Sequence, residues 1–172
     1  MNPRLAVLLA CVVIVPSFAG EPAKNAAPPG KTVVATLPAS AAVLTAPLGL
    51  KDGAIGQPEQ TELPAGGKAV FAFTVAKAGA YVVHAVVNAP GEDANSFYVN
   101  IDADPKDPLM VWDFDVTNGF EERTVSWRGN GSPEKDEIAP KVFQLTAGAH
   151  RLIVVGREPA QLKSVAIVAG SN

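Results

Sequence analysis

Cysteine, aromatic residues and runs of like charge are all scarce in this sequence of 172 residues. It has one cysteine, 6% aromatic residues and 18% charged residues. The 14 Lys and Arg residues form no basic block and are outnumbered by 17 acidic residues, so a surface that follows nucleic-acid phosphates is not expected. A hydrophobic fraction of 48% excludes wholesale disorder. These values predict a single globular domain of ordinary size.

Residues 1–19 have the pattern of a secretory signal peptide. Arg4 supplies the positive charge, and Leu5–Val15 form an apolar run that is too short to span a bilayer. Ser17-Phe18-Ala19 then places small residues at the two positions that a signal peptidase reads. We therefore expect cleavage before Gly20.

The competing interpretation is a lipoprotein. Leu8-Leu9-Ala10-Cys11 resembles a bacterial lipobox, but the apolar residues Val12–Val15 would then begin the mature chain, where lipoproteins carry a polar linker. Cleavage before Gly20 removes the only cysteine, which excludes a disulfide, a thiolate metal site and a cysteine nucleophile. An exported domain without disulfides fits the bacterial periplasm, outer envelope or extracellular medium better than an animal extracellular space.

The mature chain divides into a linker and one domain. Residues 20–32 are rich in Ala, Pro and Gly and lack hydrophobic periodicity, which is typical of an extended, solvated linker. Apolar residues return at Val33, and neither an internal repeat nor a second linker interrupts the chain before Ala169. We expect one domain over residues 33–169.

Hydrophobic residues in that domain alternate with a period of two, which is typical of strands with one buried and one solvated face. In residues 96–102 the odd positions are apolar, and the even positions, Tyr98 among them, belong to the expected solvated face. Turn signals such as Asn118-Gly119 separate the segments. The other expected strands cover residues 68–75, 81–88, 109–114, 123–127, 141–146, 149–156 and 162–168. Eight or nine short strands predict an all-β fold, either an antiparallel sandwich or a barrel.

The two tryptophans, Trp112 and Trp127, stand beside polar residues near strand ends. An indole can pack on the CH face of a sugar ring, but large aromatic residues mostly serve the core, so both roles stay open. For Arg157, an ion pair with Glu158 at a strand end competes with a ligand role. The candidate ligand-binding residues are Trp112, Trp127, Asn95, Asp113, Asn118, Arg128 and Arg157.

Motifs for metal binding and catalysis are weak. The segment Asp102–Asp107 has three carboxylates, but Lys106 and the neighbouring prolines depart from the calcium-loop pattern, so a solvated turn is expected. His84 and His150 stand alone in strand segments, which favours packed or hydrogen-bonded histidines over metal ligands. Nucleophile-elbow and phosphate-loop motifs are missing, and carboxylates adjacent in sequence do not establish a glycosidase cleft. We expect no metal, no cofactor and no enzymatic activity.

Five segments together resemble a known family: Ala78–Pro90, Asn95–Asp102, Val111–Asp113, Pro140–Glu158 and Leu162–Ile167. They are similar to non-catalytic carbohydrate-binding modules of the family 6 and family 35 type, over about residues 41–169. The resemblance implies a galactose-binding-like jelly-roll β-sandwich that binds a glycan without catalysis.

The same family usually holds a structural calcium between acidic residues of the first strand and an Asp of the last strand. Here residues 32–42 contain no Asp or Glu, and Ser164 stands at the last-strand position. Asn95 replaces the usual Asp before Ser-Phe. Because these charges are missing, the calcium that the resemblance implies is not expected in this chain.

The sequence therefore predicts an exported, stand-alone, non-catalytic carbohydrate-binding domain. Its expected partner is a glycan or polysaccharide, with neither nucleic acid nor a membrane span involved. The alternative is a structural or assembly β-sandwich that docks on another envelope or extracellular protein. A pocket with paired aromatic residues in the loops would favour the first function, and a flat apolar patch of several hundred Å² would favour the second.

Overall fold

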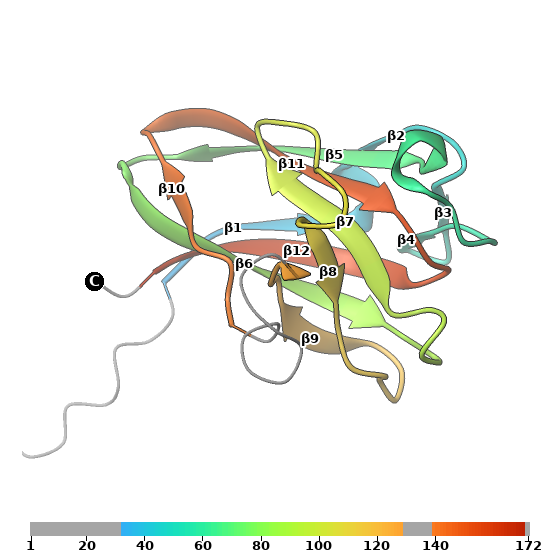
Figure 1. Cartoon of the computed structure of the whole chain (residues 1–172). Coiled ribbons are helices and arrows are strands. Elements are labelled where there is room, and N and C mark those ends of the chain that lie inside the picture. Colours follow the sequence, from blue (N-terminus) through green and yellow to red (C-terminus); the bar gives the residue numbers. More distant parts are fainter. Residues whose placement is uncertain (1–31, 129–138, 171–172) are drawn as a thin grey trace, which may run out of the picture.

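The computed structural model describes residues 32–128 and 139–170, so the expected signal peptide and nearly all of the expected linker lie outside the described residues. Two antiparallel sheets face each other in a sandwich (Figure 1). The five-stranded sheet has the order β2 (Val43–Leu44), β5 (Lys68–Val75), β11 (Gly148–Gly156), β7 (Ser96–Ile101) and β8 (Val111–Asp113). Two 3₁₀ turns, η1 (Ala39–Ala41) and η2 (Leu63–Ala65), lie in the connections.

The seven-stranded sheet is built around the pair β6 (Gly79–Asn88) and β12 (Gln161–Ala169). Along the edge of β6 that faces away from β12, β6 pairs with β9 (Glu121–Thr124) and β10 (Phe143–Leu145). Along the edge of β12 that faces away from β6, β12 pairs with β1 (Thr32–Pro38) and β4 (Ala54–Gly56). Strand β4 in turn pairs with β3 (Gly49–Lys51). The register places Thr32 of β1 opposite Ala169 of β12.

The predicted all-β, antiparallel sandwich is confirmed, with more strands than the eight or nine expected. The described residues contain twelve strands. Strands β2, β3 and β4 have only two or three residues each, which is too short for a period-two pattern to be recognised. Strand β5 has the predicted bounds, since its buried and less buried residues alternate along its whole length.

The core lies between the sheets and consists of the inward residues of both. Its fully buried side chains include Ile55, Phe71, Phe97, Leu152 and Ile167. Burial of one such side chain stabilises the fold by about 1.5–3 kcal/mol, so a core of this kind holds the domain together without a disulfide.

The solvated face that the sequence predicts for residues 96–102 is wrong for Ser96, Tyr98 and Asn100, whereas Asp102 is exposed as predicted. All six residues of β7 are buried. Tyr98 belongs to a second hydrophobic cluster with Val111, Ile153 and Val155, against which Leu63 of η2 packs. The segment that carries η2 therefore covers the outer face of β7, and the resulting burial raises the pKa of the Tyr98 phenol.

Two short strands, β8 and β9, form edges of the sandwich. In the described part of the chain β8 pairs only with β7, and β9 pairs only with β6. Figure 1 shows both strands on the same side of the molecule, where the edges of the two sheets approach each other. The described residues contain no helix that is long and apolar enough to cross a lipid bilayer.

Candidate functional site

An open groove of about 870 Å³ runs between the edge strands β8 and β9. One wall comes from β8 and the segments on either side of it, and the other comes from β9 and the residues that follow. The lining residues are Glu92, Asn95, Trp112, Asp113, Phe114, Asp115, Val116, Glu122, Arg123, Thr124 and Ser126. A groove of this size and mixed polarity fits a hydrophilic ligand of several rings or residues.

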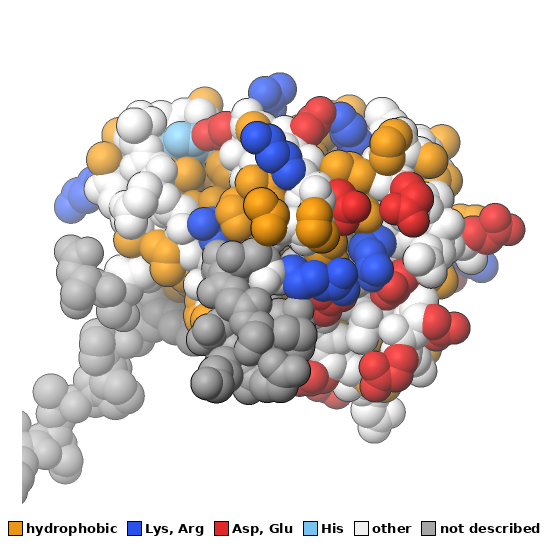
Figure 2. Space-filling model, viewed as in Figure 1, with side chains coloured by type: hydrophobic (Ala, Val, Ile, Leu, Met, Phe, Trp, Pro, Cys, Tyr) orange, Lys and Arg blue, Asp and Glu red, His pale blue; other side chains and the backbone are white. Residues whose placement is uncertain are grey.

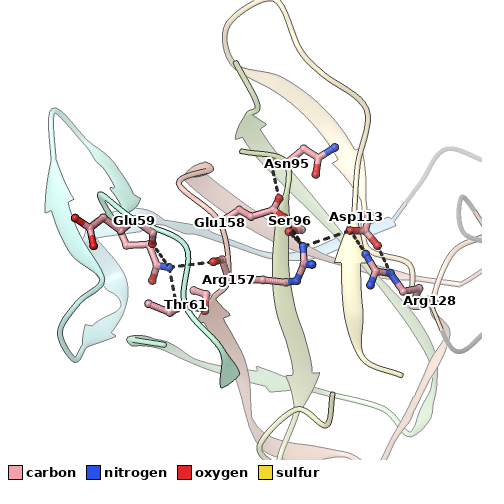
Figure 3. Close-up of polar contacts among 10 residues, drawn as sticks. Glu59, Thr61, Asn95, Ser96, Asp113, Arg128, Arg157 and Glu158 are labelled. Atoms are coloured by element: carbon pink, nitrogen blue, oxygen red, sulfur yellow. Dashed lines mark hydrogen bonds and ion pairs between the residues drawn. The ribbon is translucent and has the colours of Figure 1, made fainter. Parts of the chain in front are cut away.

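Asn95 is held at the groove by its backbone. Its N–H donates to Oε2 of Glu158 at 3.1 Å, and its carbonyl accepts from the N–H of Phe114 at 3.0 Å. In Figure 3 the side-chain amide points away from Glu158. The amide is therefore fixed at its base and can offer both a donor and an acceptor to a ligand.

Behind Asn95, Arg157 forms the centre of a polar network (Figure 3). Its Nη1 donates to Oγ of Ser96 at 2.6 Å and pairs with Oε1 of Glu158. The same Nη1 lies 3.9 Å from Oδ1 of Asp113. The predicted strand-end ion pair of Arg157 and Glu158 is confirmed, and it connects the β11–β12 turn to β7 and β8.

Asp113 forms a two-pronged ion pair with Arg128. Nε of Arg128 donates to Oδ2 of Asp113 at 2.8 Å, and Nη2 donates to Oδ1, also at 2.8 Å. Because two parallel N–H···O bonds fix both partners, this geometry is stronger and more directional than a lysine contact. Of the seven candidate residues, the structure thus brings Asn95, Asp113, Arg128 and Arg157 together.

Trp112 lines the groove but belongs to the core. Its side chain is 1% exposed, and its ring centroid lies 4.6 Å from that of Phe114 and 6.5 Å from that of Phe97. The core alternative holds for this indole, because neither of its faces is open to a sugar ring.

Trp127 is half-buried, and both its indole N–H and its ring already contact other residues of the protein. Its Nε1 donates to the carbonyl of Val99 at 2.8 Å, and Nζ of Lys141 lies 4.0 Å from the ring centroid. The ring also meets Phe143 edge-on at 5.7 Å. The site prediction for Trp127 stays a prediction, although these contacts give the residue a structural role.

Asn118 lies apart from the residues that line the groove. Its N–H donates to Oε1 of Glu121 at 2.9 Å, in the turn where Gly119 has a φ of 83°. This bond, together with a bond from Arg123, lowers the pKa of the Glu121 carboxyl. Asn118 thus shapes the turn that leads into β9.

Sequence reasoning missed Gln57, which joins the network from the opposite side. Its Nε2 donates to the carbonyl of Glu59, to Oγ1 of Thr61 and to the carbonyl of Arg157, at 2.8, 3.0 and 3.3 Å. Its Oε1 lies 1.8 Å from where a Cβ on Gly156 would stand, so any larger residue there would displace the Gln57 amide from its position. No sequence pattern marks an isolated Gln as a buried residue; the only local signal is the glycine.

A second polar pair joins Asp102 and His150 at the end of the five-stranded sheet. Nδ1 of His150 lies 2.6 Å from Oδ2 of Asp102, and Nε2 lies 2.8 Å from the carbonyl of Thr146. Both ring nitrogens face acceptors, so the doubly protonated ring fits best. The bond to Asp102 raises the pKa of His150, as does the bond to Thr146, against the effect of burial.

The pKa of Asp102 is lowered. Burial on its own would raise it, but the bonds from His150 and from the N–H of Arg151 outweigh burial. Nζ of Lys68 also holds Asp104 at 2.8 Å. Two carboxylates of the acidic turn are thus bonded to cations or backbone, and the described residues hold no group of three or more potential metal ligands.

These shifts predict how stability changes with pH. His150 has a folded pKa above its ordinary value of 6.5, so its contribution is complete below pH 6.5 and is lost as pH rises through the raised pKa. Asp102 has a folded pKa below 3.8, so its contribution is complete above that value and is lost as pH falls through the lowered pKa. The unfolding temperature should therefore fall as pH rises from 6.5 through the raised pKa of His150, and this fall should be smaller in the His150→Gln variant. Equal slopes in thermal melts of the two proteins would contradict this assignment.

No protein-family model and no curated protein sequence matches this chain. The sandwich is nevertheless similar to solved structures. A family 35 carbohydrate-binding module from Clostridium thermocellum matches with a TM-score of 0.54 and 13% identity, over 79% of this chain and 98% of that module. A family 35 module from an environmental isolate matches with a TM-score of 0.52 and 16% identity, over 80% and 93% of the two chains. The fold is that of family 35 carbohydrate-binding modules.

The same family 35 fold also occurs as one part of larger enzymes. The GH26-CBM35 β-(1,4)-mannanase of Podospora anserina matches with a TM-score of 0.54 and 15% identity, over 80% of this chain. This chain spans 28% of that mannanase. This chain covers almost the full length of both binding modules, which confirms at the level of the fold the resemblance found in the sequence.

Proposed function

We propose that this chain is an exported, non-catalytic carbohydrate-binding domain and that a glycan occupies the groove between β8 and β9. The observation that carries the proposal is the nearly complete overlap with two family 35 carbohydrate-binding modules. The groove supports it further, because it is open, largely polar and long enough for several sugar rings. Export rests on the signal-peptide pattern of residues 1–19.

Three candidate residues have distinct roles in this proposal. Asn95 offers an amide whose backbone is fixed at both its N–H and its carbonyl. Asp113 lines the groove with its carboxylate oriented by Arg128, so it accepts hydrogen bonds from sugar hydroxyls at a set position. Such preorganised polar groups favour recognition because little side-chain freedom is lost on binding.

The test compares two asparagines. A glycan array of the mature protein first identifies a bound oligosaccharide. For that ligand, Asn95→Ala should weaken binding by about tenfold, the effect of losing one or two hydrogen bonds. Asn118→Ala is the matched control, since Asn118 is outside the groove lining, and its affinity should stay within about twofold of the wild type. Isothermal titration calorimetry measures both.

Two results would count against the proposal. Equal losses in both variants would place the glycan outside the groove. A wild-type protein that retains no glycan on the array would instead favour the assembly-protein alternative.

A further inference from the structure

The lining of the groove has an excess of negative charge. Four of its side chains are carboxylates, and one is a guanidinium, that of Arg123. The carboxylates are Glu92, Asp113, Asp115 and Glu122. Figure 2 shows several acidic side chains over the turn between β6 and β7, beside a group of Lys and Arg side chains over β8.

Arg123 and Arg128, two described cations beside the groove, are already paired. Nη2 of Arg123 lies 2.9 Å from Oε2 of Glu121, and its Nη1 donates to the backbone carbonyl of Glu122 at 3.0 Å. The guanidinium of Arg128 is bonded to both oxygens of Asp113. These cations are not free to neutralise a negatively charged ligand, which would therefore meet net repulsion in the groove.

Two of the carboxylates are exposed and form no ion pair in the described part of the chain: Glu92 and Asp115. They lie on the segments that flank β7 and β8 and face the shared groove. A cationic group in the groove would find partners here without breaking an existing pair.

Among the described residues, the groove has no exposed aromatic ring on which a sugar could stack. Its two aromatic residues, Trp112 and Phe114, are 1% and 7% exposed. A sugar ring in this groove therefore gains little from stacking, and recognition must depend on hydrogen bonds and charge. An acidic groove without a stacking surface favours a ligand that itself carries positive charge.

We propose that the groove binds glycans with protonated amino groups, of the glucosamine type, and excludes uronic acids. This inference rests on the proposed function and adds the ligand class. The ammonium groups pair with Glu92 and Asp115, while Asn95 bonds neighbouring hydroxyls.

The experiment compares oligosaccharides of one length in calorimetric titrations at low salt. The probes are a fully deacetylated glucosamine oligomer, its fully N-acetylated counterpart and a galacturonic acid oligomer. We expect the glucosamine oligomer to bind at least about tenfold more tightly than its acetylated form, since several charges act together, and the galacturonic acid oligomer not to bind. The preference should shrink as salt is raised, because exposed charges are screened.

Variants identify the carboxylates. Glu92→Gln and Asp115→Asn should each weaken binding of the glucosamine oligomer by about two- to fivefold, which is the range for the loss of an exposed ion pair. The affinity for the acetylated oligomer should not change in either variant. Glu59→Gln removes an exposed carboxylate outside the groove lining and should change neither affinity. A loss in Glu59→Gln equal to that in the groove variants would show that overall charge, and not the groove, attracts the ligand.

The outcomes separate this inference from the proposed function. If the acetylated oligomer binds as tightly as the glucosamine oligomer, the charge preference is wrong and the glycan-binding proposal stands. If no oligosaccharide of any charge binds, the proposed function itself fails. If spermine competes as well as the glucosamine oligomer does, the groove recognises charge alone, and the assignment to an amino sugar is overturned.

Discussion

Replacing Trp112 with alanine is expected to lower the free energy of unfolding by about 3–5 kcal/mol, the range for removal of a large aromatic side chain from a core. The indole is 1% exposed and packs against Phe97 and Phe114, so its loss leaves a cavity between the sheets at β8. Urea denaturation measures the effect as a lower midpoint with a nearly unchanged slope. A variant as stable as the wild type would show that Trp112 is not a core residue.

Phe120→Ala is the matched control for this prediction. Phe120 is 40% exposed, and Nζ of Lys163 lies 5.2 Å from its ring centroid. An exposed contact of this kind contributes about 0.5–1 kcal/mol, so this variant should lose far less stability than Trp112→Ala. Comparable losses would mean that truncating any aromatic side chain destabilises the sandwich, whatever its burial.

The second large effect is expected for Glu158→Ala. The side chains of Glu158 and Arg157 are 9% and 20% exposed, so truncation leaves a mostly buried guanidinium without its carboxylate and removes the acceptor of the Asn95 N–H. Breaking a buried pair in this way costs about 3 kcal/mol. Arg157 keeps Ser96 as a hydrogen-bond partner and the carboxylate of Asp113 at 3.9 Å, which holds the loss below that of a completely unpaired charge.

Lys68→Ala provides the comparison for an exposed pair. Lys68 and Asp104 lie 2.8 Å apart, as close as many buried pairs, but their side chains are 40% and 65% exposed. Solvent screens such a pair, and its loss should cost at most about 1 kcal/mol. Denaturant midpoints of the two variants, measured in the same buffer, check the contrast. Equal shifts would show that burial does not decide the energy of these pairs.

The sequence predicts a strand well where one face of the strand is buried and the other is less buried. The predicted bounds of β5 match the observed ones because its buried residues alternate with less buried ones along the whole strand. Tyr98 shows the limit of this reasoning. Its position in the alternation predicts a solvated side chain, but Leu63, far away in the sequence, covers it. Coverage by a distant segment leaves no trace in local periodicity.

The site is only partly predictable for a related reason. Turn-adjacent polar residues are reasonable candidates, and four of the seven do come together around Arg157 and Asp113. Which partner each one chooses depends on the register of β7 against β8, which places Ser96 opposite Asp113 and brings both within reach of Arg157. The burial of Trp112 depends in the same way on Phe97 and Phe114, which reach it from neighbouring segments.

The pairing of Thr32 with Ala169 has a mechanical consequence. The two ends of the described domain are neighbours in one antiparallel ladder, with the chain leaving the sandwich at the same edge (Figure 1). Ladder bonds in such a pair run perpendicular to the strands, so a force that pulls the two ends apart loads the bonds one after another. Strand β1 buries little of its surface and would peel from β12 first, whereas the edge strands of the groove pair with β7 and β6 and not with β1. The domain therefore yields to tension at its ends by unzipping one strand before its ligand-facing side is disturbed.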